Sequence, residues 1–252
     1  MPVFDSDGVS IAYLLAGEPN AQPILLIHGF GSTSEVNWVN PGWVDRLVQE
    51  GRRVIAIDNR GHGGSERLYD PDLYDSRDCM AEDARRLLDH LDIERADVMG
   101  YSMGARITVF LAIRHPERVR SAILGGLGYA VVTGLDGAEH IAAALEAPSP
   151  LGFTGQPRAF RAFADQTGSD RLALAACMRG SRRKVSEEEI RTIGMASLVA
   201  VGTTDDIAGS GPDLVKLLPR GQYLPIPGRD HMRAVGDRVF LDGVARFLND
   251  RT

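Results

Sequence analysis

The sequence predicts an α/β fold, in which a mainly parallel β-sheet is flanked by helices on both faces and carries an inserted helical cap. Three observations predict it. Short apolar, β-branched runs alternate with helical patterns along most of the 252 residues. The runs at residues 24–27 and 54–57 are continuously apolar, as in strands that are buried on both faces. Pro116, Pro212 and Pro219 stand at the edges of helical patterns, where proline is tolerated.

The elements follow one another in a regular order. Apolar positions at residues 3–4 and 9–15 predict an N-terminal hairpin. Further strands are predicted at residues 24–27, 54–57, 96–99, 119–124, 198–201 and 223–226. Apolar residues spaced three and four apart predict helices at residues 43–49, 80–91, 105–114, 214–218 and 239–248.

The alternation stops between about residues 127 and 194. There a loop with Pro148, Pro150 and Pro157 separates patterns that are all helical, such as residues 141–145 and 160–163. We therefore predict a helical cap at residues 127–194, inserted between two parts of one core, residues 1–126 and 195–252. No internal repeat indicates a repeat architecture.

Composition and charge limit the function. A content of 44% hydrophobic and 25% charged residues is typical of a soluble globular chain. The net charge of −6 disfavours a nucleic-acid partner, because binding phosphates needs clustered positive charge. No segment approaches the ~18 apolar residues of a membrane span, and the first residues lack the pattern of a signal peptide. We expect no membrane insertion and a cytoplasmic location, with Cys79 and Cys177 as free thiols.

A candidate nucleophile lies in Gly100-Tyr101-Ser102-Met103-Gly104, which follows the strand at residues 96–99 and opens the helix at residues 105–114. A sharp strand-to-helix turn at a serine strains the backbone there and requires glycine two residues to either side. This context predicts an exposed Ser102 at the carboxyl end of a central strand, with a helix N-terminus that stabilises negative charge. An ordinary strand-to-helix turn is the alternative.

A serine hydroxyl needs a base within hydrogen-bond reach and a group that orients the base. Among six histidines, His231 is the candidate base, because its loop follows the last strand at the same sheet edge as Ser102. The loop after the strand at residues 198–201 offers two adjacent acids, Asp205 and Asp206. The chain order of serine, acid and histidine favours a catalytic triad over a pair of turn-forming aspartates.

The oxyanion of an acyl-transfer reaction needs backbone N–H donors. Met103 follows the nucleophile and is the first candidate. The second is Phe30, because His28-Gly29-Phe30-Gly31 follows the strand at residues 24–27 and its glycines let the backbone turn an amide toward the site. The Phe30 ring would then wall the acyl pocket, or it covers the core as an ordinary loop residue.

These motifs together resemble the α/β-hydrolase superfamily, in its serine-nucleophile, capped, esterase-like bacterial branch, and the resemblance covers essentially the whole chain. Residues 28–31 are similar to the family's oxyanion loop, residues 58–65 to its D-x-R-G-x-G-x-S turn and residues 100–104 to its nucleophile elbow. The family's acid usually lies three residues after a strand-ending glycine, which from Gly202 implies Asp205. The sequence at residues 203–204 and 208–211 differs from the usual family pattern. Such a difference could move the position of the acid by one residue.

Serine at the elbow implies acyl transfer to water, with no cofactor and no metal, since no Cys or His pairs occur at ligand spacing. The leading expectation is a carboxylesterase that cleaves small-molecule esters of short to medium chain through an acyl-enzyme on Ser102. Two alternatives are a carbon–carbon bond hydrolase of vinylogous diketones with the same triad, and a non-enzymatic ligand receptor. Apolar side chains in the cap indicate either a pocket lining or packing onto the core: Leu145, Leu151, Phe153, Phe160, Phe163 and Met178.

Overall fold

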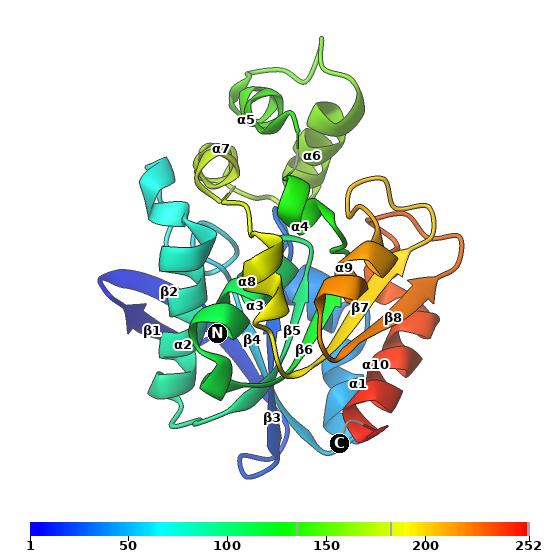
Figure 1. Ribbon diagram of the computed structural model, residues 1–252. Helices are drawn as coiled ribbons and strands as arrows, with labels where there is room; N and C mark the ends of the chain where they lie inside the picture. The colour runs from blue at the N-terminus through cyan, green and yellow to red at the C-terminus, as the bar shows by residue number, and fades with distance from the viewer. Residues whose placement is uncertain (135, 182, 251–252) are drawn as a thin grey trace.

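The centre of the computed structural model is an eight-stranded sheet (Figure 1). The structure describes residues 1–134, 136–181 and 183–250. The strand order is β1-β2-β4-β3-β5-β6-β7-β8, in which β2 runs antiparallel to β1 and β4 and all other neighbours are parallel. The strands are β1 (Val3–Ser6), β2 (Val9–Ala16), β3 (Gln22–Ile27), β4 (Arg52–Ile57), β5 (Ala96–Tyr101), β6 (Val119–Gly125), β7 (Ala196–Gly202) and β8 (Gly221–Ile226). The predicted mainly parallel sheet is confirmed.

Continuous apolar strands form because both faces of the sheet are covered. Along β3, Leu25 and Ile27 belong to one hydrophobic cluster, while Ile24 and Leu26 belong to a second cluster on the opposite face. Alternate side chains of a strand point to opposite faces, so every position of this run contacts apolar side chains. At the edge, Ser6 pairs with Val9, which leaves a two-residue hairpin loop of the Asp-Gly type between β1 and β2.

Helices cover both faces, as the sequence predicts. On one face lie α1 (Trp43–Gln49) and α10 (Arg238–Asp250), where the rings of Trp43 and Phe240 meet edge to face with centroids 4.9 Å apart. The other face is covered by α2 (Ala81–His90), α3 (Met103–Arg114) and α9 (Gly211–Leu217). Figure 1 shows α1 and α10 side by side behind the sheet, with α2 and α3 on its opposite side.

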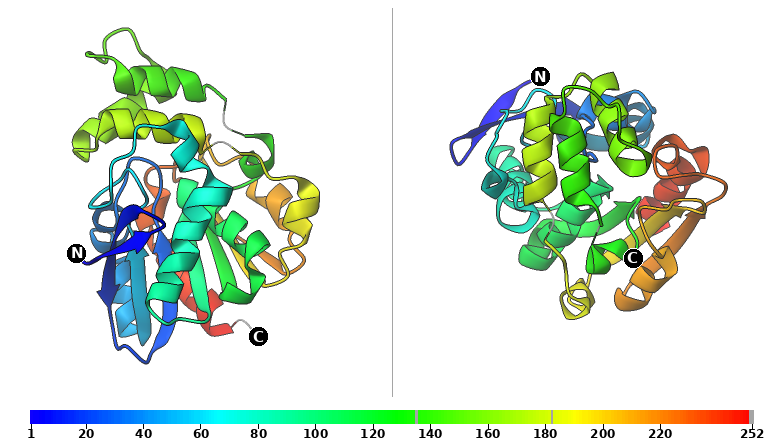
Figure 2. Two further views of the ribbon diagram at one scale, coloured as in Figure 1. Left: turned by 90° about the vertical axis from the view of Figure 1, so that its left-hand side faces the viewer. Right: turned by 90° about the horizontal axis from the view of Figure 1, so that it is seen from above.

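Five helices lie between β6 and β7 in the described residues: α4 (Ala130–Thr133), α5 (Ala138–Glu146), α6 (Gly155–Gln166), α7 (Arg171–Gly180) and α8 (Glu187–Arg191). Of these, α5, α6 and α7 stand beyond the sheet edge to which β7 and β8 point (Figure 1), and Figure 2 shows them as a separate layer. The division into a core and a cap at residues 127 and 194 stays a prediction.

One expectation about this segment is wrong. Pro157 was expected in a loop, but it lies in the first turn of α6. Proline is tolerated there because the first N–H groups of a helix have no partner within the helix.

Short helical turns complete the chain at Glu35–Val39, Pro71–Tyr74, Ser76–Met80, Pro116–Arg118 and Ala234–Gly236. None of the helices in the described part of the chain has both the length and the apolar composition that crossing a membrane requires.

Candidate active site

Ser102 stands at the turn between β5 and α3, with backbone angles of φ 54° and ψ −111°. The turn is so tight that a Cβ on Gly100 would lie 2.2 Å from the Gly104 carbonyl oxygen, and one on Gly104 would lie 1.9 Å from the Ile27 carbonyl oxygen. Only glycine fits at both positions, because these neighbours are backbone atoms that cannot move aside. Local sequence therefore forces the strained turn that exposes the serine at the end of its strand.

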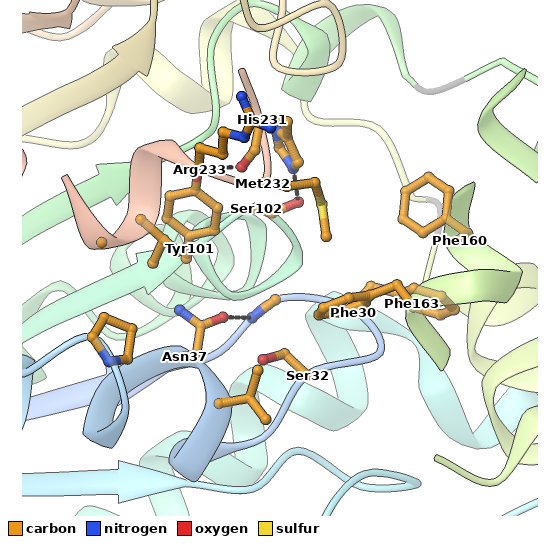
Figure 3. Close-up of a pocket in the computed structure, with 15 residues that line it drawn as sticks. Phe30, Ser32, Asn37, Tyr101, Ser102, Phe160, Phe163, His231, Met232 and Arg233 are labelled. Atoms are coloured by element: carbon orange, nitrogen blue, oxygen red, sulfur yellow. Dashed lines mark hydrogen bonds between the residues drawn. The ribbon is translucent and has the colours of Figure 1, made fainter. Parts of the chain in front are cut away.

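The structure brings Ser102, His231 and Asp205 into one hydrogen-bonded chain. His231 Nε2 lies 2.8 Å from Ser102 Oγ, a contact that Figure 3 shows. On the other side of the ring, His231 Nδ1 lies 2.8 Å from Asp205 Oδ2. A carboxylate only accepts, so Nδ1 carries the proton and Nε2 is left to accept from the serine hydroxyl. This is the arrangement in which histidine can act as a base toward serine.

Asp205 is fixed from its other side as well. Its Oδ1 accepts from the backbone N–H groups of Ile207 and Ala208, each at 2.9 Å. Burial acts to raise the pKa of Asp205, but the hydrogen bond and charge of His231 together with the two amides outweigh burial and lower it. The carboxylate is therefore charged at neutral pH. Its neighbour Asp206 is exposed.

The two predicted oxyanion donors border the same space as Ser102. Within the described residues, neither the Phe30 nor the Met103 backbone N–H donates to a protein acceptor. Both residues line a small cavity next to Ser102. Unpaired N–H groups beside a serine nucleophile are the donors that a developing oxyanion requires.

A network behind Phe30 holds its loop in place. Asn37 Oδ1 accepts from the Gly29 N–H at 3.1 Å, and Figure 3 shows this contact below Tyr101. His28 Nε2 accepts from the Asn59 N–H at 3.0 Å, so its Nδ1 carries the proton and donates to the Gly29 carbonyl at 2.7 Å. Buried His28 and the 58–65 turn thereby position the loop that carries Phe30.

Two cavities meet at the serine. The larger has a volume of about 310 Å³, and Phe30, Ser102 and Phe160 line both cavities. Figure 3 shows Phe160 and Phe163 of α6 across the space from Tyr101 and Arg233. The larger cavity is lined by Gly29, Phe30, Ser32, Val36, Asn37, Pro41, Tyr101, Ser102, Phe160, Phe163, His231, Met232, Arg233, Val235 and Gly236.

The six apolar residues singled out between β6 and β7 have different environments. Phe160 and Phe163 line the larger cavity. Leu145 and Met178 are fully buried, whereas Leu151 is 84% exposed. Phe153 lines neither cavity.

None of the other histidines is hydrogen-bonded to Ser102 within the described residues. His90 contacts Tyr13, His115 contacts Glu82, and His140 lies in α5. His62 is buried next to His28, with ring centroids 5.2 Å apart. In the described parts of the chain, no three His, Cys, Asp or Glu side chains lie together as a metal site would require.

Sequence reasoning missed three residues that border the site: Asn37, Tyr101 and Arg106. The Tyr101 hydroxyl donates to the carbonyl of His231 at 2.6 Å and so ties the histidine loop to β5. Arg106 lies one turn along α3 from the serine, since its N–H donates to the Ser102 carbonyl at 3.1 Å. Arg106 follows Ser102 by four residues, a spacing that is visible in the sequence and places both residues on the same side of a helix.

Comparisons with known proteins agree with this architecture. A family profile described as alpha/beta hydrolase fold matches residues 22–175. The 2-hydroxymuconate semialdehyde hydrolase of Pseudomonas sp. (strain CF600) is 42% identical over 117 residues, which cover 45% of this chain and 40% of that protein. The chain spans 40% to 46% of the length of this and two further curated relatives.

Solved structures match over nearly the whole chain. The enol-lactonase from Burkholderia xenovorans LB400 has a TM-score of 0.78 and 25% identity, over 99% of this chain and 100% of that one. A hydrolase from Pseudomonas aeruginosa PA01 has a TM-score of 0.81 and 25% identity, over 98% of this chain and 97% of that one.

Proposed function

Because the chain belongs to the alpha/beta hydrolase fold family, we propose that it is a serine hydrolase that cleaves carboxylic esters of short to medium chain. The single observation that carries this proposal is the hydrogen-bonded chain from Ser102 Oγ through His231 to Asp205, with both distances at 2.8 Å. Its Ser102 end lies beside the backbone N–H groups of Phe30 and Met103, neither of which has an acceptor among the described residues. Nucleophile, base, orienting acid and oxyanion donors are the four parts that acyl transfer by a serine enzyme needs.

The reaction proceeds in two halves. Ser102 Oγ attacks the ester carbonyl carbon while His231 Nε2 takes the hydroxyl proton, and the oxyanion accepts from the Phe30 and Met103 N–H groups. The imidazolium, stabilised by the Asp205 carboxylate, passes its proton to the leaving alcohol as the C–O bond breaks. Water then attacks the acyl-serine ester, again with His231 as base, and releases the acid and free Ser102.

Two further observations support an ester substrate of modest size. The larger cavity, about 310 Å³, is at the small end of the range for ligand sites and is walled by Phe160 and Phe163. The similar Burkholderia protein is named an enol-lactonase, and a lactone is a cyclic ester. We infer that α5, α6 and α7 form the cap over this cavity.

A second candidate is carbon–carbon bond hydrolysis with the same three residues. One observation favours it: the relative that is 42% identical over 117 residues is named for a semialdehyde substrate, which is not an ester. In that reaction the triad would act on a ketone or aldehyde carbonyl in place of an ester carbonyl.

The test is hydrolysis of p-nitrophenyl esters from acetate to palmitate by the wild type and by Ser102→Ala. We expect the wild type to cleave short and medium esters and the variant to lose at least ~10³-fold in kcat/KM, because the nucleophile is gone. Circular dichroism of both proteins controls for folding. If folded wild type cleaves no ester, the esterase proposal fails, and release of acid from a vinylogous diketone becomes the assay for the second candidate.

A further inference from the structure

The described part of the structure buries four arginine side chains, and one of them has no acidic partner. Arg52 pairs with Asp97 at 3.0 Å, Arg60 with Asp83 at 2.7 Å and Arg161 with Asp165 at 2.9 Å. Arg106, only 6% exposed, forms no ion pair with any described carboxylate.

The hydrogen bonds of Arg106 leave most of its guanidinium donors unused. Nη1 donates to the Arg183 carbonyl at 3.0 Å and Nη2 to the Ala130 carbonyl at 3.4 Å. Nε donates to none of the described residues. A guanidinium has five N–H donors, so three have no acceptor among the residues that the structure describes. Burial lowers the pKa of Arg106 to about 10, which still leaves the group charged at neutral pH.

This cation faces the nucleophile. Arg106 lines the smaller cavity together with Ser102 and both proposed oxyanion donors, and it lies one turn along α3 from the serine. The cavity volume is about 50 Å³. Since about 10–15 Å³ suffices for one water molecule, the space fits a group of about three to five heavy atoms, such as the two methylene groups and the carboxylate of a succinyl chain.

The position of His231 decides which part of an ester occupies each cavity. His231 lines the larger cavity and not the smaller one. The leaving oxygen must face His231 Nε2 to receive its proton, so the alcohol lies in the larger, apolar cavity. A short acyl part then points into the smaller cavity, toward Arg106, whereas a medium-length acyl chain exceeds its volume and has to extend past Phe160, which lines both cavities.

We propose that Arg106 forms a carboxylate-binding subsite, and that the substrates are monoesters of short dicarboxylic acids with an apolar alcohol. The inference rests on the proposed function and deepens it, because it names the acid part of the ester. A substrate carboxylate would accept from the free guanidinium donors and neutralise a cation that no described acid neutralises. Planar bidentate recognition of a carboxylate is the geometry that arginine favours.

The experiment compares two esters that differ only in charge, monobutyl succinate and butyl 4-methylpentanoate, in which an isopropyl group replaces the carboxylate. Hydrolysis is followed by alkali uptake at constant pH. We expect wild type to favour the succinate monoester at least about tenfold in kcat/KM, the size of a hydrogen bond to a charged group. Arg106→Met should bring this ratio close to one, and Arg106→Lys, which keeps the charge but loses the planar fork, should give an intermediate ratio.

Three results would overturn the subsite. The first is a wild-type ratio near or below one, which needs no variant and so holds even if Arg106→Met does not fold. The second is an equal loss on both esters in a folded Arg106 variant, which would indicate a structural or oxyanion role. The third is a collapse of the ratio in Arg233→Met, because Arg233 is a side chain 76% exposed at the larger cavity.

Binding measurements separate this inference from the proposed function. Titration calorimetry of succinate with Ser102→Ala and with Ser102→Ala/Arg106→Met needs no turnover. If wild type hydrolyses neither ester, the esterase proposal has failed, and calorimetry still judges the subsite. Binding that is at least about tenfold weaker without Arg106 supports the subsite, whereas equal affinities or no binding to Ser102→Ala overturns it.

Discussion

Asp205 and Asp206 are neighbours in one loop, yet only Asp205 reaches the histidine, at 2.8 Å, while Asp206 is exposed. We predict that Asp205→Asn lowers kcat/KM for the preferred p-nitrophenyl ester by about 10²–10⁴-fold, because an amide no longer holds the imidazole in the tautomer that can accept from serine. Asp206→Asn is the matched control and should stay within about twofold, since exposed substitutions away from such contacts have small effects. Steady-state kinetics measures both, and equal losses would contradict the assignment of the acid.

The buried side chain of His62 makes the free energy of unfolding depend on pH. Its Nδ1 donates to the Arg60 carbonyl at 2.9 Å, and its Nε2 is buried without a partner among the described residues. Burial, helped by neighbouring His28, lowers the pKa of His62 to about 3. Below about pH 6.5 the unfolded chain therefore binds a proton that the folded chain does not, and the free energy of unfolding falls by up to about 1.4 kcal/mol per pH unit down to pH 3.

Urea unfolding at pH 7 and pH 5 tests this effect in wild type and in His62→Gln, which cannot titrate. We expect the wild type to lose about 2 kcal/mol more than the variant between the two pH values. His28, whose pKa burial also lowers, contributes to the loss in both proteins and cancels in the comparison. The same loss in both proteins would show that His62 is not the group that titrates.

At the scale of elements, the turn from β5 to α3 depends on its two glycines. We predict that Gly104→Ala lowers the free energy of unfolding by at least about 2 kcal/mol or prevents folding, because the new Cβ meets the Ile27 carbonyl oxygen at 1.9 Å. Gly194→Ala is the matched control, since nothing lies within 4 Å of a Cβ there. It should change stability by no more than about 0.5 kcal/mol in urea unfolding. Equal stability of the two variants would mean that the turn relaxes.

Helix α6 brings an apolar side chain to the reacting group. Phe160 lines both cavities and meets the Phe30 ring edge to face, with centroids 5.7 Å apart. We expect Phe160→Ala to lower kcat/KM for a medium-chain p-nitrophenyl ester by about tenfold or more, since apolar pocket contacts contribute about 1–3 kcal/mol. Leu151→Ala, an exposed position between α5 and α6, should leave it unchanged. Unchanged kinetics for Phe160→Ala would remove α6 from the binding site.

For the whole molecule, the sequence was most informative where burial is complete. The strands are predictable because a parallel sheet covered on both faces requires continuous apolar runs. The N-terminal hairpin is predictable because two short apolar runs follow each other closely in the chain. The elbow is predictable because strand, serine, glycines and helix must coincide. The pairing of His231 with Asp205 had to come from the resemblance, since two adjacent loop aspartates have the same local pattern.

The features that could not be predicted depend on which face of a helix packs against the core and which face lines the cavities. Between β6 and β7, periodicity indicates helices but not their orientation, so Leu145 and Phe160 looked alike although one is buried and the other lines the site. Arg106 was missed because α3 is buried at ten of its twelve positions and has no polar face. In such a helix Arg106 is the only buried charged residue, and a buried cation is the exception that marks a site.

The backbone of Ser102 has a consequence for how this protein can change. Its φ of 54° is one that glycine adopts at little cost, whereas a side chain held in such a region costs on the order of 1–3 kcal/mol. Replacing the serine by glycine would relax the backbone there and remove the proposed nucleophile in one step. Stability and reactivity thus place opposite demands on position 102. Selection for heat resistance alone would favour replacing the serine, whereas selection for turnover would keep the serine and its backbone strain.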